Sequence, residues 1–327
     1  ERSMFFQLAE VLPAFPTPTW DLTKQLGVTY AVGPVPGSAN DAPTPDFTQL
    51  LWQKDRFRQA GIDLVVLETA FPWAHHAKIG GPNAEAEIET CCELIRNMGK
   101  VGVPVACWNW MAVFNWVRTS LTIPTRGGAF VTGYDHALMA DAPLTDEGIV
   151  TEETLWANLK RFMEAVVPVA EEAGVKLALH PDDPPISPIR GIGRILTSPD
   201  AMMKAIDLVP SPNNGITFCQ GSFATMNADI PAEIDRFSQR GAIHFVHFRD
   251  VEGNPSRFQE TFHDDGRTDM WAAMQAYHRN GFSGPMRPDH VPTMATENNG
   301  EPGYEVLGRL FALGYIKGLV KGVEKSA

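Results

Sequence analysis

The chain has 327 residues, 44% of them hydrophobic, which is enough for one large α/β barrel or two ordinary domains. Its formal net charge of −12 comes from 27 basic and 39 acidic residues, and the basic residues form no run, so we expect no nucleic-acid partner. No apolar stretch is long enough to span a membrane and no signal-peptide pattern opens the sequence, so we expect no membrane partner and a cytoplasmic location.

Strand-like and helix-like segments alternate along the chain, and we predict eight strand–helix pairs. The strands are expected at Met4–Leu12, Val28–Val32, Asp63–Glu68, Val103–Trp110, Lys176–His180, Gly215–Cys219, Ile243–Phe248 and Gly284–Pro288. The helices are expected at Trp20–Leu26, Phe47–Ala60, Ala84–Val101, Glu152–Ala173, Pro199–Leu208, Pro231–Arg240, Asp269–Asn280 and Tyr304–Val323.

This alternation predicts a single α/β domain over residues 1–327, a (β/α)8 TIM barrel, because eight strands that alternate with helices form a closed parallel barrel. A doubly wound sheet is disfavoured, since no GxGxxG motif follows a strand and opens a helix. Two stretches without periodicity, near residues 34–45 and 119–144, are expected to be long β→α loops on the catalytic face. Gly174 is expected to end the long helix before it, and Asp269 to cap the helix after it.

Four polar signatures stand at the ends of apolar runs, namely LALHPDD at His180, ITFCQG at Cys219, FVHFRD at His247 and MRPDH at Asp289. Each residue alone is more often structural than functional. In a barrel, however, the C-terminal ends of all strands open onto one face, so the four side chains should converge there. Two imidazoles, a thiolate and a carboxylate together favour a divalent metal such as Mn²⁺, Fe²⁺, Co²⁺ or Zn²⁺ over Mg²⁺.

Other polar residues near the strand ends have competing interpretations. His244 and His247 are three residues apart in one strand and point to opposite faces, so we expect only His247 at the barrel mouth. Arg249 shares the face of His247 and is expected to hold a substrate carboxylate through two parallel hydrogen bonds. Glu68, at the end of DLVVLE, stays open between metal ligand, substrate contact and structural partner.

Two motifs, HPDDPP at His180–Pro185 and RPDH at Arg287–His290, are the most specific of a larger set. The others are at Val66–Thr69, Lys78–Asn83, Ile95–Gly102, Cys107–Thr119, Ile192–Ile195, Thr217–Ser222, His247–Arg249 and Pro302–Tyr304. Together they resemble the D-mannonate dehydratases, a family of the xylose-isomerase-like TIM-barrel superfamily. The resemblance runs from about Asp63 to the C-terminus, with a gap through Thr125–Thr151.

The resemblance implies roles for individual residues. The divalent metal, usually Mn²⁺, would be held by His180, Cys219, His247 and Asp289. Proton transfer would fall to His290 and Tyr304, without an indication of which is the base. Arg249 would lie close to the substrate, and the other expected substrate contacts, all within matching segments, are Glu68, Asn109 and Arg118. Tyr304 rests on the family pattern alone, whereas the four metal ligands follow from the strand ends as well.

The expected reaction is the removal of water from D-mannonate or a related aldonate to give a 2-keto-3-deoxy sugar acid. Two alternatives are a metal-dependent sugar isomerase or epimerase of the same superfamily, which the cysteine ligand disfavours, and a non-catalytic barrel that binds a sugar acid. The sequence departs from the family pattern near the mouth, with Asn115 in place of Asp and Val291 in place of Gly. These departures leave the particular sugar acid open, and assembly into a homo-oligomer is also left open.

Overall fold

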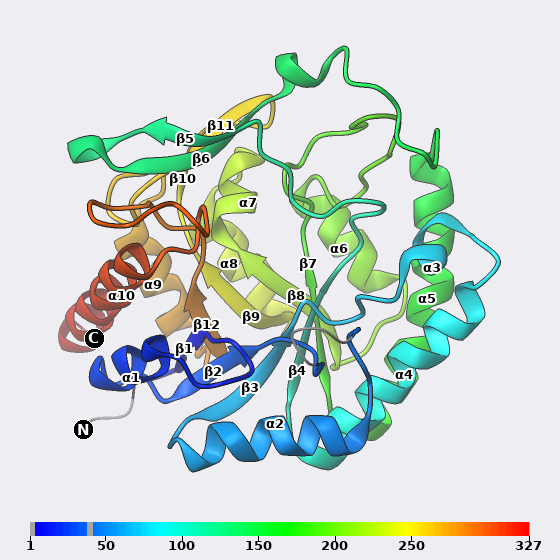
Figure 1. Ribbon diagram of the computed structural model, residues 1–327, viewed down its shortest axis with the longest axis horizontal. Coiled ribbons are helices and arrows are strands. Elements are labelled where there is room, and N and C mark those ends of the chain that lie inside the picture. Colours follow the sequence, from blue (N-terminus) through cyan, green and yellow to red (C-terminus); the bar gives the residue numbers. More distant parts are fainter. Residues whose placement is uncertain (1–3, 38–41, 327) are drawn as a thin grey trace.

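The computed structural model describes residues 4–37 and 42–326, and its centre is a closed barrel of eight parallel strands (Figure 1). The strands are β1 (Gln7–Val11), β2 (Tyr30–Gly33), β3 (Asp63–Glu68), β4 (Val105–Asn109), β7 (Lys176–His180), β8 (Asn214–Cys219), β9 (Ile243–Phe248) and β12 (Pro285–Pro288). They pair in the order β1-β12-β9-β8-β7-β4-β3-β2, and the ring closes between β2 and β1. The predicted TIM barrel is therefore confirmed, and each of the eight predicted strands is present.

Helices surround the barrel and follow the strands in chain order. Their bounds are α1 (Pro18–Gln25), α2 (Phe47–Gln59), α3 (His75–Ile79), α4 (Ala84–Val101), α5 (Glu152–Ala173), α6 (Pro199–Asp207), α7 (Gln220–Thr225), α8 (Ile230–Gln239), α9 (Met270–Arg279) and α10 (Val306–Ser326). The ends of α5 follow the sequence signals. Thr151 accepts a hydrogen bond from the backbone N–H of Thr154 at the start, and Gly174, with a φ of 68°, ends it as predicted. No helix among the described residues is long and apolar enough to cross a membrane.

Asp269 caps α9 as predicted, because its side chain accepts a hydrogen bond from the backbone N–H of Ala272 at 2.9 Å. We expect Asp269→Ala to lower the free energy of unfolding by about 1 kcal/mol, since one of the first helical N–H groups would lose its partner. Urea denaturation measures this loss. Asp269→Asn is the matched control, because asparagine caps equally well; an equal loss in both variants would contradict a capping role.

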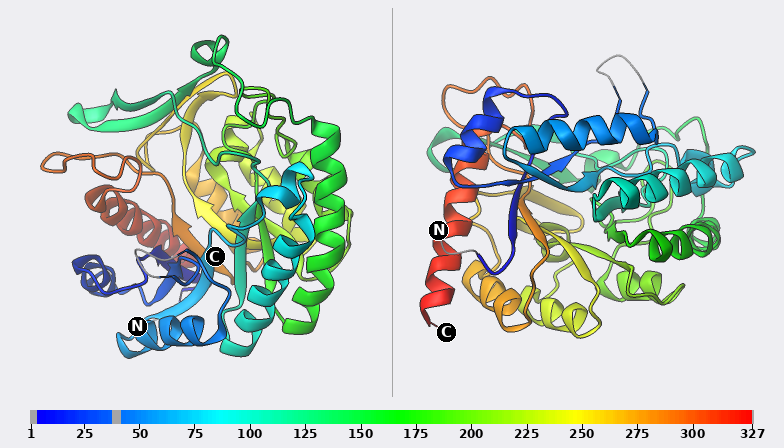
Figure 2. Two further views of the ribbon diagram at one scale, coloured as in Figure 1. Left: turned by 45° about the vertical axis from the view of Figure 1, so that its right-hand side comes forward. Right: turned by 90° about the horizontal axis from the view of Figure 1, so that it is seen from below.

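A second, smaller sheet lies beside the barrel mouth and includes part of the stretch 119–144, for which the sequence predicted a long β→α loop. Its antiparallel order is β10-β11-β6-β5, with β5 (Ser120–Pro124), β6 (Phe130–Asp135), β10 (Val251–Asn254) and β11 (Arg257–Glu260). Two short 3₁₀ helices, η1 (Arg126–Gly128) and η2 (His136–Met139), complete this stretch. The stretch 119–144 lies in the connection from β4 to α5, and the two strands within it were not anticipated from the sequence. Figure 2 shows β5 and β6 as a hairpin that stands out from the barrel.

The two halves of this small sheet come from segments more than 100 residues apart, which is why local periodicity did not reveal it. The register places Phe258 of β11 opposite Tyr134 of β6, and both side chains are buried. Of the other predicted loop, 34–45, the described parts hold neither helix nor strand, and residues 38–41 lie outside the described residues.

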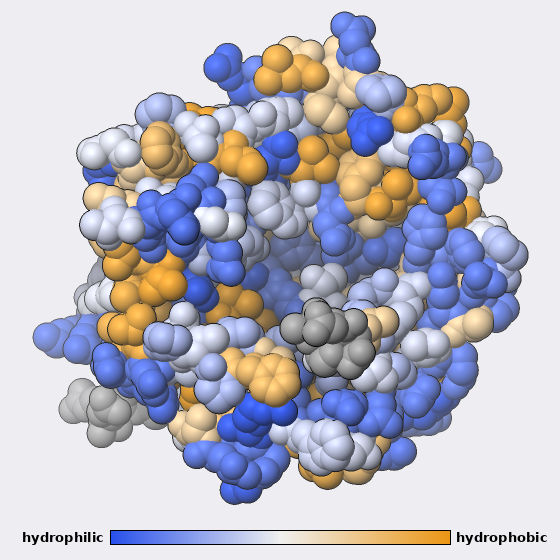
Figure 3. Space-filling model, viewed as in Figure 1, coloured by the Kyte–Doolittle hydropathy of each residue, from blue (hydrophilic) through white to orange (hydrophobic). Residues whose placement is uncertain are grey.

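The interior of the barrel is packed with apolar side chains, most of them small or branched. This inner cluster consists of Ala9, Val32, Val65, Val66, Val105, Cys107, Ala178 and Phe245. A larger cluster fills the layer between strands and helices. Figure 3 shows the molecule hollowed near the centre of this view, with hydrophilic side chains in the hollow.

Candidate active site and metal centre

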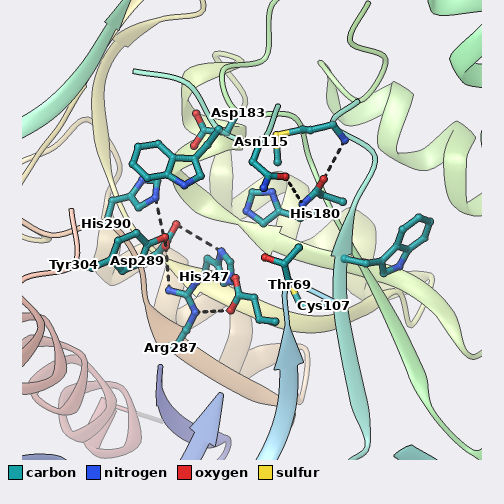
Figure 4. Close-up of a pocket in the computed structure, with 15 residues that line it drawn as sticks. Thr69, Cys107, Asn115, His180, Asp183, His247, Arg287, Asp289, His290 and Tyr304 are labelled. Atoms are coloured by element: carbon teal, nitrogen blue, oxygen red, sulfur yellow. Dashed lines mark hydrogen bonds and ion pairs between the residues drawn. The ribbon is translucent and has the colours of Figure 1, made fainter. Parts of the chain in front are cut away.

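The four predicted metal ligands converge at the mouth of the barrel, and Figure 4 shows three of them, His180, His247 and Asp289. His180 and Cys219 are the last residues of β7 and β8, His247 is the penultimate residue of β9, and Asp289 directly follows β12. One donor atom each from His180, Cys219 and His247 lies within 4.8 Å of the other two. Asp289 Oδ2 lies 3.5 Å from His247 Nδ1 and 3.9 Å from Cys219 Sγ. The barrel thus brings together four donors from four strand ends.

The chemistry of these donors fits a divalent cation. His180 Nδ1 donates to the Pro181 carbonyl oxygen at 2.6 Å, so Nε2 keeps its lone pair for a metal. Both ring nitrogens of His247 are buried and neither has a hydrogen-bond partner among the described residues, although the carboxylates of Glu68 and Asp289 lie 3.1 and 3.5 Å away. The two buried carboxylates beside this imidazole carry negative charge, which stabilises a cation bound at this position.

The two cysteines at the site differ in their ionisation. Burial raises the pKa of Cys219, but Arg249 and His180 outweigh burial and hold this pKa well below its usual value. Arg249 Nη1 lies 3.3 Å from Cys219 Sγ. Burial, together with the Glu68 carboxylate, raises the pKa of Cys107. Cys107 also forms a possible ligand group, with Glu68 and His247. Because a thiolate and not a thiol binds metal, the ionisation favours Cys219 as the ligand.

A cavity of about 130 Å³ lies in front of these ligands. Its wall includes the predicted residues His180, His247, Asp289, His290, Tyr304, Glu68 and Asn109. Lys78 Nζ lies 3.4 Å from Asn109 Oδ1, and Asn109 Nδ2 donates to Asn115 Oδ1 at 3.4 Å. Asn115 also lines the cavity, so one of the two departures from the family pattern faces the place where a substrate would lie. Two amides, of Asn109 and Asn115, thus line part of the cavity, and the Lys78 ammonium group contacts the first of them.

Glu68 is held by an arginine from the opposite part of the barrel. Arg287 donates to Glu68 through Nε at 3.0 Å and Nη2 at 2.8 Å, and its Nη1 donates to Asp289 Oδ1 at 3.0 Å. Burial raises the pKa of Glu68, but Arg287 and His247 outweigh it, so the carboxylate is ionised. Of the three interpretations left open for Glu68, the ion pair is present, and the carboxylate still faces the cavity and His247.

The two arginines expected at the substrate, Arg118 and Arg249, are bound to protein carboxylates instead. Arg249 donates to Glu260 through Nε at 2.8 Å and Nη2 at 2.7 Å, and Arg118 donates to both oxygens of Asp183 at 2.6 and 2.9 Å. Their side chains are 0% and 1% exposed, and the described wall of the cavity includes neither. They act from behind the wall, where they fix the carboxylates and, through Arg249, the thiolate.

The proposed proton-transfer residues lie side by side at one edge of the cavity. The rings of His290 and Tyr304 are 5.2 Å apart and perpendicular, and Trp116 packs 4.9 Å from the imidazole. The Tyr304 hydroxyl donates a hydrogen bond to Asp289 Oδ1 at 3.3 Å. Burial and the neighbouring Asp289 raise the pKa of Tyr304 above its usual value, so the hydroxyl stays protonated.

One residue of the site escaped the sequence analysis. Glu260, the last residue of β11, places Oε1 2.9 Å from His290 Nδ1. In the structure β11 is buried at Phe258 and again at Glu260, but Gln259 and Glu260 are both polar, so the sequence carries no alternating pattern that could have identified the strand. The histidines assigned to other places behave differently. His244 Nδ1 contacts the Leu177 carbonyl oxygen inside the protein, in agreement with the expected strand parity.

Comparisons with known proteins identify the family of this chain. The family model for D-mannonate dehydratase (UxuA) matches residues 21–149 and 146–327. Mannonate dehydratase 2 of Halalkalibacterium halodurans is 34% identical over 84% of this chain and 87% of its own length. Mannonate dehydratase of Thermotoga maritima is 35% identical over 89% of this chain and 91% of its own length. The crystal structure of mannonate dehydratase from Streptococcus suis serotype 2 superposes with a TM-score of 0.89 at 31% identity and covers 99% of this chain and 95% of that chain. The chain belongs to the D-mannonate dehydratase family.

Proposed function

We propose that this protein removes water from D-mannonate or a closely related aldonate, with the help of a divalent metal, and releases a 2-keto-3-deoxy sugar acid. The observation that carries the proposal is the cavity in which His180, His247 and Asp289 face the pair His290 and Tyr304, with Cys219 behind them. Family membership supports the reaction class, and the donor chemistry supports the metal.

The metal would be held by His180, Cys219, His247 and Asp289, and Mn²⁺ is the proposed ion. A thiolate makes the site softer than an all-oxygen one, so Fe²⁺, Co²⁺ and Zn²⁺ are the alternatives and Mg²⁺ is disfavoured. When bound, the cation supplies positive charge that stabilises the electron-rich species formed when a proton is removed next to a carboxylate. The ion pair of Glu68 with Arg287 keeps His247 and Asp289 in place, since it contacts both.

The protein's own residues move the protons. One C–H bond breaks at C2, alpha to the carboxylate, and the C3–O bond breaks as the hydroxyl leaves with an added proton as water. The resulting enol rearranges to the 2-keto acid. Because Tyr304 stays protonated, it is suited to donate a proton to the departing C3 hydroxyl. The base at C2 is then His290, whose ring lies against Tyr304 and faces the cavity.

We expect the Mn²⁺-loaded protein to convert D-mannonate into a 2-keto-3-deoxy acid, which the periodate–thiobarbiturate colour reaction detects. The same assay should be run with other aldonates and with aldarates, which carry a second carboxylate, because Asn115 puts a neutral amide at the cavity where the family pattern has an aspartate. Fe²⁺, Co²⁺ and Zn²⁺ form a parallel series.

The other outcomes of this screen are informative. An isomeric sugar detected by chromatography, without a 2-keto acid, would indicate an isomerase or epimerase. Binding of a sugar acid in calorimetry, without any product under all four metals, would indicate a non-catalytic barrel. Either result would overturn the proposed dehydratase activity.

A further inference from the structure

The small sheet brings a buried carboxylate to the back of the proposed base. Glu260 Oε1 lies 2.9 Å from His290 Nδ1, and the Glu260 side chain is 0% exposed. The same oxygen accepts hydrogen bonds from Arg118 Nη2 at 2.6 Å and Arg249 Nη2 at 2.7 Å. Asp183 binds the other sides of both guanidinium groups, at 2.6 and 3.1 Å. Two buried guanidinium groups therefore fix Glu260 against the imidazole.

The charge of Glu260 dictates where His290 carries its proton. Burial raises the pKa of Glu260, but Arg249, His290 and Arg118 outweigh burial and lower it to about 2. At neutral pH the carboxylate is ionised and can only accept a hydrogen bond. A hydrogen bond between the two groups therefore places the proton on Nδ1. A neutral imidazole carries one such proton, so Nε2, which lies 3.9 Å from Asp289 Oδ1, keeps its lone pair.

We infer that Glu260 is a positioning residue that holds His290 in the Nδ1–H tautomer and fixes the orientation of its ring. Nε2 is then the atom that takes the C2 proton, an assignment that rests on the proposed function. The inference gives the small sheet a role as well. The antiparallel pairing of β11 with β6 sets where Glu260 ends the strand, and Arg118 lies two residues before β5 of the same sheet.

Arg118 makes the tautomer depend on Glu260 in particular. Its Nη2 lies 3.2 Å from His290 Nδ1, and a guanidinium group can only donate. With Glu260 present, Nη2 has a carboxylate at 2.6 Å, and Nδ1 donates to the same carboxylate. Without Glu260, Arg118 is the remaining neighbour of Nδ1, and it requires a lone pair there. The proton would move to Nε2, and the imidazole would present a donor to the cavity where catalysis needs an acceptor.

The first experiment reads the tautomer in the unmodified holoprotein. The protein is labelled with ¹⁵N-histidine and loaded with diamagnetic Zn²⁺, and long-range ¹H–¹⁵N correlation spectra distinguish protonated from unprotonated ring nitrogens. His290→Gln assigns the signals by their absence. We expect Nδ1 protonated and Nε2 unprotonated. The reverse pattern in the wild-type protein would overturn the inference, whatever the substrate proves to be, so failure of the inference and failure of the proposed function remain distinguishable.

The second experiment compares Glu260→Ala and Glu260→Gln with Gln259→Ala, the neighbouring position on β11. We expect Glu260→Ala to move the histidine proton to Nε2 and to lower kcat about 100-fold or more, with KM and metal content little changed, because the wrong tautomer cannot act as base. Glu260→Gln retains a carbonyl acceptor and should recover part of kcat. An unchanged tautomer and kcat in Glu260→Ala would overturn the inference, and so would an equal loss in Gln259→Ala, which would reflect general disturbance of the strand.

Discussion

Replacing His290 with asparagine is expected to lower kcat for the aldonate by about 10²–10⁴-fold, the usual contribution of a positioned base, while metal content stays at the wild-type level. The asparagine amide can still donate to Glu260 in place of Nδ1–H, so the buried cluster keeps its hydrogen bond. Only the lone pair of Nε2 is lost. Steady-state kinetics on purified protein, with metal measured by mass spectrometry, test this.

Two comparisons make the His290 result specific. His278, on α9, packs against Phe5 and is absent from the described wall of the cavity. His278→Asn should therefore leave kcat unchanged. Tyr304→Phe removes the proposed acid and should also lower kcat without removing metal. If His290→Asn loses the metal together with activity, His290 belongs to the coordination sphere, and the assignment of base and ligand along β12 would have to be exchanged.

Much of the site could be predicted because the topology of the barrel determines where the ends of its strands lie. His180, Cys219 and His247 stand at the C-terminal ends of three parallel strands, and in a closed barrel these ends meet at one face. Strand parity separated His247 from His244 for the same reason, since alternation along a strand is fixed by backbone geometry. Helix bounds followed from caps such as Asp269 that act within one turn.

The rest could not be predicted because it depends on contacts between distant segments. Glu260 matters only through its neighbours Arg118, Arg249 and His290, which stand 142, 11 and 30 residues away in the sequence. Arg249 shows the limit of strand-end reasoning. A side chain of the right parity can reach either a substrate or a protein carboxylate, and the small sheet that supplies Glu260 was not visible in the local pattern.

Replacing Cys219 with serine is expected to weaken metal binding by at least about 100-fold, since loss of a residue that only orients a ligand through a hydrogen bond already costs about 10–100-fold. The buried Cys219 thiolate is stabilised by Arg249 Nη1 at 3.3 Å and by a hydrogen bond from Ser222 Oγ at 3.3 Å. A serine hydroxyl does not ionise in this environment, so the site loses both a negative charge and its soft donor. Titration of the metal-free protein with Zn²⁺ and Mn²⁺ measures the loss.

Cys107→Ser is the discriminating partner of this variant, because Cys107 forms the rival ligand group with Glu68 and His247 at the same cavity. Burial keeps Cys107 a thiol, whose sulfur accepts a hydrogen bond from Thr217 Oγ1 at 3.2 Å, so its replacement should leave metal affinity nearly unchanged. Loss of metal in Cys107→Ser, with retention in Cys219→Ser, would move the centre toward β3 and β4. In Cys219→Ser, the affinity for Zn²⁺ should also fall more than the affinity for Mn²⁺, because sulfur favours the softer ion. Equal losses of affinity would show that charge alone sets the affinity.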